Sequence, residues 1–388
     1  MQKKFFLTIL LALFALATSA DVLASLRWQA TIDRAPDSLK KDLEDYDYLV
    51  SFVEKNYAPF DAIMQKGYKR EYKSLKKQIR AQLCKGESDL EKATSDYVIW
   101  FYSQFDRHIA VETTAFDMAQ GNMMSEAIIK LDSTILTNPE FEYNPKPVSC
   151  KVDSLTWLIR VPSCSSDYYK WTINALRQFD ESSCENLIID VRQNNGGNDG
   201  VWNRYYDMLY DHPGKPSVSW FRNTPENLKF WKRAVASVQT PEEYNRNFIR
   251  ECESSKKKFV KRGETSSDTG RKPTTRIRRA AVIIDLMTAS AGESIVDFVK
   301  NHSDRAKVYG ISNTLGSNLT GNCWDEAVLP NSKIGIFYAT TVDSGFYEKD
   351  FSEGIGIVPD VIIPLPMARK FTDNIDKWVL WVAEDLKR

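Results

Sequence analysis

The chain has 388 residues, 43% of them hydrophobic, which is enough to fill the core of one large domain or of two smaller ones. Lysine plus arginine and aspartate plus glutamate each number 52, so the formal charges balance. That balance argues against a protein that binds nucleic acid or an anionic membrane through its net charge.

The first 20 residues have the layout of a secretory signal peptide. Lys3 and Lys4 precede an apolar run from Phe5 to Ala17, and small residues follow it. The run is too short to span a bilayer comfortably, and no cysteine comes directly after it to carry a lipid. We therefore expect residues 1–20 to be a signal peptide and the mature protein to be exported, periplasmic or extracellular, without a stable membrane anchor.

The cysteines give a second, weaker indication of compartment. An even count in an exported protein permits disulfides, but the wide spacings leave the pairing open. Clustered Cys/His spacings of the kind that bind zinc are missing, so we expect no metal and no cofactor. The six residues are Cys84, Cys150, Cys164, Cys184, Cys252 and Cys323.

Residues 25–107 are predicted to form an amino-terminal helical domain. Apolar side chains recur there every three or four residues in two runs, and a third helix is expected to start at a capping box formed by Ser88 and Glu91. The runs are Leu39, Leu43, Tyr46, Val50 and Val53, and then Tyr68, Tyr72, Leu75, Ile79 and Leu83.

Residues 108–388 are predicted to form an α/β domain. Short β-branched runs such as LTWLIRV, NLIIDV, AAVIIDL and AKVYGI alternate from about residue 154 with helix-length stretches. Such alternation indicates a largely parallel core sheet. A polar segment at about 213–279 interrupts it, with two predicted helices and a basic loop, and we interpret this segment as a solvated insertion.

Four stretches of the chain contain candidate site residues, and each also has an ordinary structural interpretation. His108 follows the third predicted helix in FDRHIAVE, either as a surface group or as a catalytic base. Gly196 and Gly197 end the strand LIIDVRQNNGG, either in a tight turn or as backbone donors to an oxyanion. Their sequence lacks the Walker and dinucleotide-binding patterns.

The third stretch is AAVIIDLMTASAGES. Ser290 lies where a predicted strand turns into a helix, with Glu293 three residues later, so it is either a helix cap or a nucleophile at a helix start that stabilises an oxyanion. The N–H of Ala291 would be the second oxyanion donor. The fourth stretch, FSEGIGIVPD, contains Glu353, either as a solvated residue or as a site residue.

Together and in this order, the stretches DRH, DVRQNNGG, TASAGE and GIVPD resemble the tail-specific, or carboxyl-terminal-processing, serine peptidase family. That family includes the tricorn protease core and the retinoid-binding protein of the interphotoreceptor matrix. The resemblance implies a crotonase/ClpP-like ββα core, Ser290 as nucleophile, His108 as general base, Glu353 as its support, and an oxyanion hole formed by Gly196 or Gly197 with Ala291. It also implies a peptide or protein substrate.

Two departures from the family pattern affect this interpretation. Ser317, in TLGS, stands where one branch of the family has its catalytic lysine, so the base is expected to be His108, as in the tricorn-like branch. Arg107 stands where a small or hydroxyl residue usually helps to orient the histidine, and an arginine cannot accept the imidazole N–H. Either Glu353 contacts His108 directly, or Arg107 pairs with Glu353 and another group orients the ring. Arg107 and Asp106 are therefore predicted to lie around the histidine.

Only about 45 residues separate His108 from the strand LTWLIRV, too few for the PDZ domain of many relatives. The sequence thus predicts an exported serine endopeptidase without a PDZ domain. The alternative is a catalytically inactive member of the same fold that binds a small apolar ligand or a partner. The oligomeric state is left open.

Overall fold

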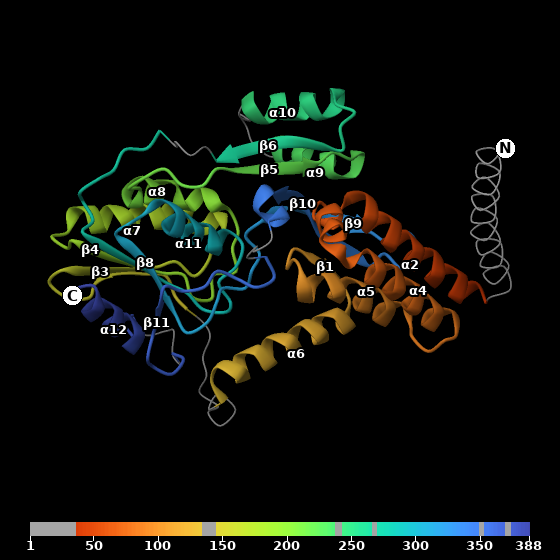
Figure 1. Cartoon of the computed structure of the whole chain (residues 1–388), viewed down its shortest axis with the longest axis horizontal. Coiled ribbons are helices and arrows are strands. Elements are labelled where there is room, and N and C mark those ends of the chain that lie inside the picture. Colours follow the sequence, from red (N-terminus) through yellow and green to blue (C-terminus); the bar gives the residue numbers. More distant parts are fainter. Residues whose placement is uncertain (1–35, 134–144, 237–242, 266–269, 349–352, 369–373) are drawn as a thin grey trace, which may run out of the picture.

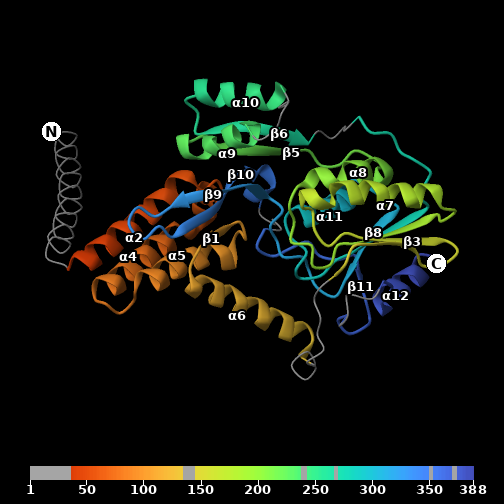
Figure 2. The same cartoon turned by 180° about the vertical axis from the view of Figure 1, so that it is seen from behind.

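The computed structural model describes residues 36–133, 145–236, 243–265, 270–348, 353–368 and 374–388. The predicted signal peptide lies outside this range. Two sheets organise the molecule, one in each half (Figures 1 and 2). None of the described helices is both long and apolar enough to cross a membrane.

The larger sheet has six strands in the order β11-β8-β7-β4-β3-β2. Its strands pair in parallel except β2, which pairs antiparallel with β3. The central strands are buried on both faces, which explains their continuous apolar sequences. Their bounds are β2 (Val148–Lys151), β3 (Thr156–Arg160), β4 (Asn186–Asp190), β7 (Arg279–Ile283), β8 (Ala306–Gly310) and β11 (Val361–Ile362).

Helices cover both faces of this sheet. Side chains such as Leu187, Ile189 and Val282 pack on one face against α7 (Tyr169–Glu181), α8 (Asn203–Leu209) and α11 (Ala291–His302). Alternate side chains, such as Ile188 and Ile283, pack on the other face against α12 (Lys377–Asp385). This period of two is what a strand between two helical layers requires. The predicted α/β core is therefore confirmed.

The second sheet is antiparallel, with the order β1-β10-β5-β6 and with β9 paired to β10. Its strands come from distant parts of the chain, because its central strand β10 lies near the carboxyl end and β1 near the amino end. The bounds are β1 (Ile109–Val111), β5 (Ser217–Arg222), β6 (Phe259–Thr265), β9 (Thr320–Val328) and β10 (Gly335–Asp343).

The predicted amino-terminal helices are present and pack against this second sheet. Their core also contains Trp324, Tyr338 and Val342 from β9 and β10. The third long helix is capped by Asp89, whose carboxylate accepts the N–H of Lys92 at 2.8 Å, so the predicted Ser88 cap is wrong by one residue. The helices are α2 (Asp37–Asn56), α3 (Phe60–Ile63) with a π-helical turn (Met64–Tyr68), α4 (Lys69–Cys84), α5 (Leu90–Gln104) and α6 (Thr114–Leu131).

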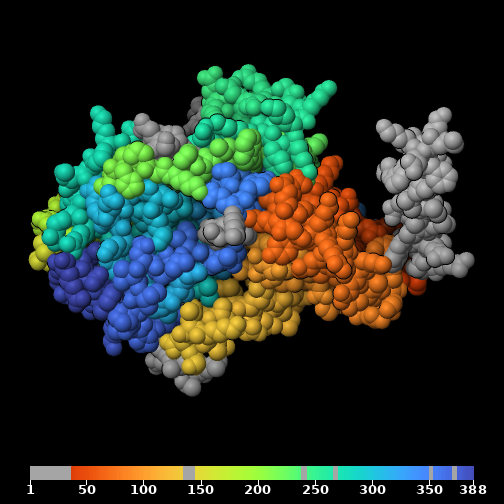
Figure 3. All heavy atoms as spheres, in the orientation of Figure 1, coloured from red at the N-terminus to blue at the C-terminus, as the bar shows by residue number. Residues whose placement is uncertain are grey.

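In its described residues, the polar segment at 213–279 lies outside the six-stranded sheet up to Arg278, since Arg279 begins β7. It contains α9 (Pro225–Ala236) and α10 (Glu243–Ser254), and it also supplies β5 and β6, which the sequence did not predict. These elements form the upper edge of the molecule in Figure 3, while α6 extends along its lower edge toward the larger sheet. Three short 3₁₀ helices complete the described elements, at Ser166–Tyr168, Asp199–Trp202 and Ser344–Tyr347.

Candidate active site

Ser290 lies where β7 gives way to α11, as the sequence predicts. Its φ of 51° is in the left-handed region that non-glycine residues rarely adopt, so the turn is strained. The backbone N–H of Ser290 donates to Glu293 Oε2 at 3.1 Å and to Ser317 Oγ at 2.8 Å. These contacts hold the strained turn and leave the side chain at the start of the helix.

The loop between β8 and β9 supports this turn from the side. Ser317, at the position of the family lysine, donates its hydroxyl and its N–H to the buried carboxylate of Glu293, at 3.0 and 2.7 Å. The N–H of Gly316 also donates to Glu293, at 3.0 Å. The Glu293 carboxylate therefore accepts hydrogen bonds both from the nucleophile turn and from the β8–β9 loop, so its role in this arrangement is structural.

His108 contacts Ser290 from the other sheet. The histidine lies just before β1, and its Nε2 is 3.0 Å from the Ser290 hydroxyl. Its backbone C=O accepts the N–H of Ala339 in β10 at 2.9 Å, which anchors the residue to the second sheet. Of the three histidines of the sequence, all of them in the described ranges, only His108 contacts Ser290. The site thus spans the junction between the two sheets.

The other side of the imidazole faces a hydroxyl. His108 Nδ1 is 2.8 Å from Thr320 Oγ1, and Thr320 Oγ1 is 2.7 Å from Asp106 Oδ1 and 2.9 Å from Glu353 Oε1. Asp106 Oδ1 itself is 3.6 Å from Nδ1, too long for a hydrogen bond. Asp106 also accepts the hydroxyl of Tyr57 at 2.6 Å. Thr320 is therefore the group in direct contact with the ring.

The two carboxyl groups of this cluster are fully buried, but their pKa values are shifted in opposite directions. Burial, and then the negative charge of Asp106, raise the pKa of Glu353 well above its usual range. Burial would also raise the pKa of Asp106, but the nearby imidazole of His108 and the hydrogen bonds from the hydroxyl of Tyr57 and the backbone N–H of His108 hold it below its usual value. The geometry thus favours an ionised Asp106 next to a protonated Glu353.

Arg107 turns away from the imidazole. Its guanidinium stacks on the Tyr102 ring, with Cζ 4.9 Å from the ring centroid, and donates to the C=O of Tyr102 and, at 3.4 Å, to that of Gly354. Burial lowers the pKa of Arg107. Neither arrangement expected from the sequence is found among the described contacts, because Arg107 forms no ion pair with Glu353, and Thr320, not Glu353, meets His108 Nδ1.

The glycine-rich loop lies against the nucleophile turn. A Cβ on Gly196 would be 2.6 Å from Ser290 Cβ, and one on Gly197 would be 2.5 Å from the C=O of Cys164, so neither position has space for a side chain. The N–H of Gly196 donates to the Asn194 side chain at 2.9 Å. Within the described ranges, the N–H groups of Gly197 and Ala291 donate to no protein acceptor. Gly197 and Ala291 are therefore the pair whose N–H groups are available.

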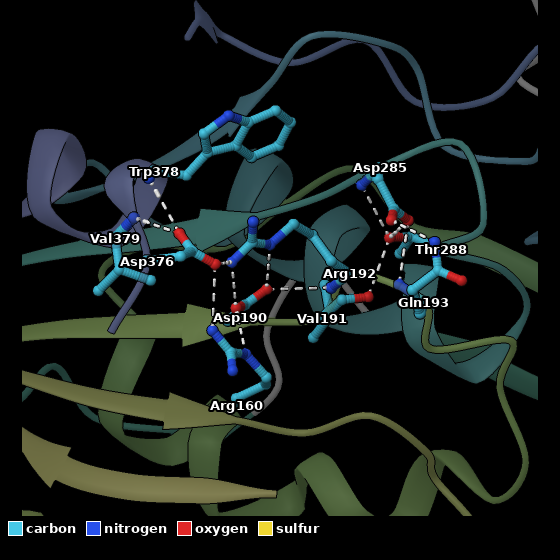
Figure 4. Close-up of polar contacts among 10 residues, drawn as sticks. All are labelled: Arg160, Asp190, Val191, Arg192, Gln193, Asp285, Thr288, Asp376, Trp378 and Val379. Carbon is cyan, nitrogen blue, oxygen red and sulfur yellow. Dashed lines mark hydrogen bonds and ion pairs between the residues drawn. The ribbon is translucent and has the colours of Figure 1, made fainter. Parts of the chain in front are cut away.

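A buried ion-pair network anchors the strand that leads into this loop (Figure 4). Arg192 donates to Asp190 and Asp376 at 2.7 and 2.6 Å, and Arg160 donates to Asp190 at 2.7 Å. Asp376 caps α12 by accepting the N–H of Trp378 at 2.9 Å. The arginine of the DVRQNNGG motif therefore connects the loop to the carboxyl-terminal helix.

A second set of contacts in Figure 4 ties the glycine-rich loop to the nucleophile turn. Gln193 donates its N–H and its side-chain amide to Asp285, at 3.0 and 2.8 Å. Thr288 donates its hydroxyl to the C=O of Val191 at 2.9 Å. These hydrogen bonds connect the two turns and so hold the oxyanion donors in place relative to Ser290.

A cavity of about 580 Å³ opens beside Ser290. Polar side chains from both halves of the molecule line most of it, among them Asn203, Ser217, Asp297, Asn301, Asn322 and Asp343. Gly197, Ala291 and Thr320 border it as well, so a molecule in the cavity would reach both the hydroxyl and the free N–H groups.

A metal ion would compete with existing contacts of the site, and the cysteines form no disulfides among the described residues. Asp106, His108 and Glu353 each offer one ligand atom within 4.8 Å of the others and could hold a metal ion. Both imidazole nitrogens, however, already contact hydroxyls, so a cation would have to displace Ser290 or Thr320. All six cysteines, which the described ranges include, are free thiols.

The sequence did not single out two residues of the site, Thr320 and Tyr57. Thr320 is 212 positions from His108, and Tyr57 is 49 positions from Asp106. Thr320 stands three residues after Ser317, so the loop that lacks the family lysine was the available signal. Tyr57 lies in the predicted amino-terminal helical domain but in neither of its apolar runs, so no sequence signal indicated its role.

Comparisons with known proteins identify the family of this chain. A family model described as peptidase family S41 matches residues 156–363. A search of curated proteins found no match.

Among solved structures, mature CPAF complexed with lactacystin is 13% identical, with 91% of this chain and 98% of that chain covered and a TM-score of 0.56. A serine-to-alanine mutant of CPAF is also 13% identical, with 91% and 96% covered and a TM-score of 0.57. A lipoprotein from Streptococcus agalactiae is 15% identical, with 91% and 97% covered, at a TM-score of 0.45. At these identities the CPAF structures support the fold alone.

Proposed function

Because the chain belongs to peptidase family S41, the serine peptidase family that its four motifs resemble, we propose that it is an exported endopeptidase that acts through Ser290 and His108. The observation that carries the proposal is the 3.0 Å contact between the Ser290 hydroxyl and His108 Nε2 at a helix start. His108 lies outside the matched residues 156–363, so this contact is independent of the family match.

In the proposed mechanism, the Ser290 hydroxyl attacks the carbonyl carbon of a peptide bond while His108 Nε2 takes its proton. The oxyanion that forms accepts the N–H groups of Gly197 and Ala291, aided by the positive end of α11. His108 then gives the proton to the leaving amine. Water, activated by the same nitrogen, attacks the acyl-enzyme and releases the second product and free Ser290.

A peptide or protein substrate fits the cavity better than the alternative ligand of the sequence analysis. Most of the side chains named on its walls are polar, whereas a carrier of a small apolar ligand needs an apolar pocket. Arg107, which favoured an inactive protein, has its guanidinium on the Tyr102 ring, where it does not block the serine–histidine contact. We therefore retain the peptidase as the proposed function, and export as part of it.

Labelling with a fluorophosphonate probe tests this function. The probe phosphonylates a serine hydroxyl, with loss of fluoride, efficiently only when a base activates that hydroxyl. Purified native protein is therefore expected to be modified at Ser290, identified by peptide mapping. Unfolded protein and the Ser290→Ala variant should remain unlabelled. Ser303→Ala is the matched control, since Ser303 follows the other end of α11 and donates to Asp211. Absence of label from the native protein, or label at another residue, would reject the proposal.

A further inference from the structure

On the basis of that function, we propose that Thr320 positions His108, that Asp106 supplies the negative charge behind it, and that Glu353 acts as an uncharged hydrogen-bond donor to Thr320. The family resemblance gave Glu353 the role of supporting acid, so this assignment moves the charge to a residue on another element. It follows from the hydrogen-bond capacity of a single hydroxyl.

Thr320 Oγ1 has three polar neighbours but only one proton. It lies 2.8 Å from His108 Nδ1, 2.7 Å from Asp106 Oδ1 and 2.9 Å from Glu353 Oε1. To accept the proton of Ser290, His108 must leave Nε2 bare and carry its proton on Nδ1, so Nδ1–H donates to Thr320. The Thr320 hydroxyl can then donate to just one carboxyl group. The other carboxyl must then hold a proton, which it is placed to donate to Thr320.

The donors around each carboxyl decide which one is ionised. Besides Thr320, Asp106 accepts the backbone N–H of His108 at 2.8 Å and the hydroxyl of Tyr57 at 2.6 Å. Glu353 accepts only the N–H of Leu319, at 2.6 Å, among described residues other than Thr320. More donors stabilise the charged form, so Asp106 is the carboxylate and Glu353 the acid.

The ionisable groups around the pair are compatible with this assignment. The pKa of Tyr57 is raised well above its usual range by burial and then by Asp106, which keeps its hydroxyl a donor. Cys323, on β9, likewise has a raised pKa, from burial and then Asp106. Glu293 adds a further negative charge that disfavours ionisation of Glu353, and the Arg107 guanidinium lies on Tyr102. The charge of Arg107 also acts on Glu353, but burial and the negative charges of Asp106 and Glu293 outweigh it, so the pKa of Glu353 stays raised.

The strand register explains why Thr320 can act in this way. Thr320 begins β9 and pairs with Val342 of β10, while β10 pairs on its other edge with β1, which follows His108. The imidazole and the hydroxyl are therefore both held by one central strand. Because Asp106 Oδ1 is 3.6 Å from Nδ1, its charge acts on the ring, while Nδ1–H donates its hydrogen bond to Thr320.

The test measures the rate at which the fluorophosphonate probe phosphonylates Ser290, as a function of pH. Thr320→Val should slow labelling by about 10²-fold or more, and Thr320→Ser, which keeps the hydroxyl, should recover most of the rate. Thr340→Val is the matched control, because Thr340 is a buried threonine of β10 that donates only to the backbone C=O of Asn322. Circular dichroism and thermal unfolding would establish that each variant folds.

Two isosteric changes separate the carboxyl groups. Asp106→Asn removes the charge and should slow labelling by about 10²- to 10⁴-fold, with the acidic limb of the profile moved to lower pH, since the imidazolium loses its counter-charge. Glu353→Gln keeps a donor toward Thr320 and an acceptor toward Leu319, so its loss should stay below about 10-fold with the limb in place.

Each outcome bears on a separate claim. Equal losses in Glu353→Gln and Asp106→Asn, or a shift of the acidic limb in Glu353→Gln alone, would overturn the assignment of the charge. Wild-type rates in Thr320→Val would overturn the role of Thr320. Failure of the wild-type protein to label at Ser290 would instead reject the proposed function, so the two failures are distinguishable.

Discussion

Two clusters of carboxyl groups are buried in this molecule, and they are balanced in different ways. Behind the glycine-rich loop, Asp190 and Asp376 are paired with Arg160 and Arg192 (Figure 4). Around the imidazole, the described contacts include one ion pair, between Asp106 and His108, and none that involves Glu353. The first cluster has as many fixed cations as carboxylates. The second depends on a group that gains and loses a proton.

The difference separates a structural use of buried charge from a catalytic one. Burial opposes the ionisation of Asp190, but the charges of Arg192 and Arg160 hold its pKa far below the usual range, so the network keeps its charges at all working pH values. Glu353 must instead stay protonated, at a cost in stability as pH rises. The paired charges of the first cluster hold the glycine-rich loop in place. The charge of Asp106, which has no fixed cation as partner, remains available to stabilise an imidazolium.

The largest effect should follow from breaking the second cluster at its base. His108→Ala removes the proton acceptor of Ser290, so the rate of Ser290 acylation and of peptide hydrolysis should fall by about 10⁴- to 10⁶-fold. The free energy of unfolding, measured with urea, should change by only about 1 kcal/mol, because few structural contacts are lost. A variant with near-normal turnover would show that another group is the base.

Breaking the first cluster should mainly lower the free energy of unfolding, whereas breaking the second should mainly lower the rate. Arg192→Met leaves Asp190 and Asp376 with Arg160 alone, and removal of one partner from a buried network typically costs about 3–5 kcal/mol. Urea unfolding should show that loss directly. Arg233→Met is the control, since Arg233 pairs with Asp325 and Glu326 at the surface, where such pairs contribute little. Equal stabilities of the two variants would contradict the structural role of the network.

The pH dependence of stability sharpens the comparison, because the two clusters should differ in sign. The folded-state pKa of Glu353 is raised, so its contribution to stability is fully present below its unfolded value of about 4.3 and is lost as pH rises. Above that pH, the wild type should lose stability relative to Glu353→Gln by about 1.4 kcal/mol per pH unit, up to the raised pKa. Urea unfolding of both proteins from pH 4 to 8 measures this slope.

Asp190→Asn provides the contrast to that experiment. The folded-state pKa of Asp190 is depressed, so its contribution is present above its unfolded value of about 3.9 and is lost as pH falls toward the folded value. The advantage of the wild type over Asp190→Asn should therefore shrink below about pH 4. Parallel pH profiles for the two pairs of proteins would mean that Glu353 and Asp190 are ionised alike.

The smallest effect is expected at Arg107, which the sequence placed next to the base. Its guanidinium contacts the Tyr102 ring and two backbone C=O groups, not the imidazole. Arg107→Met should cost about 0.5–1 kcal/mol of stability through the lost cation–π contact. Hydrolysis by the folded protein should change by less than about 3-fold. A loss as large as that of Asp106→Asn would show that Arg107 acts on the histidine.

Several features could be predicted from the sequence because they depend on local pattern. The β-branched runs before Gly196 and Ser290 indicated buried parallel strands, and the alternation with helices indicated the α/β core. The serine after an apolar run, followed by Ala-Gly-Glu, indicated a turn at a helix start. Such signals depend on residues within one or two turns of each other, so they are readable without the fold.

The strands β5 and β6 were not predicted, because their sequences have little apolar periodicity of their own. Burial in β5 rises only at Phe221 and Arg222, and its remaining described residues are partly exposed. The pairing with β10 and with β6 stabilises it. Tertiary contacts supply what the local sequence lacks, as is common for strands.

What the sequence determined by itself was the set of reactive groups and the local turns that expose Ser290 and the glycines. What only the tertiary structure decided was which groups meet. Thr320 reaches His108 because β9 and β1 flank the same strand, and Gly197 rather than Gly196 has the free N–H because Asn194 takes the other one. The physical reason is that these hydrogen bonds need distances of about 3 Å between atoms of residues far apart in sequence. Positions along the chain do not determine those distances.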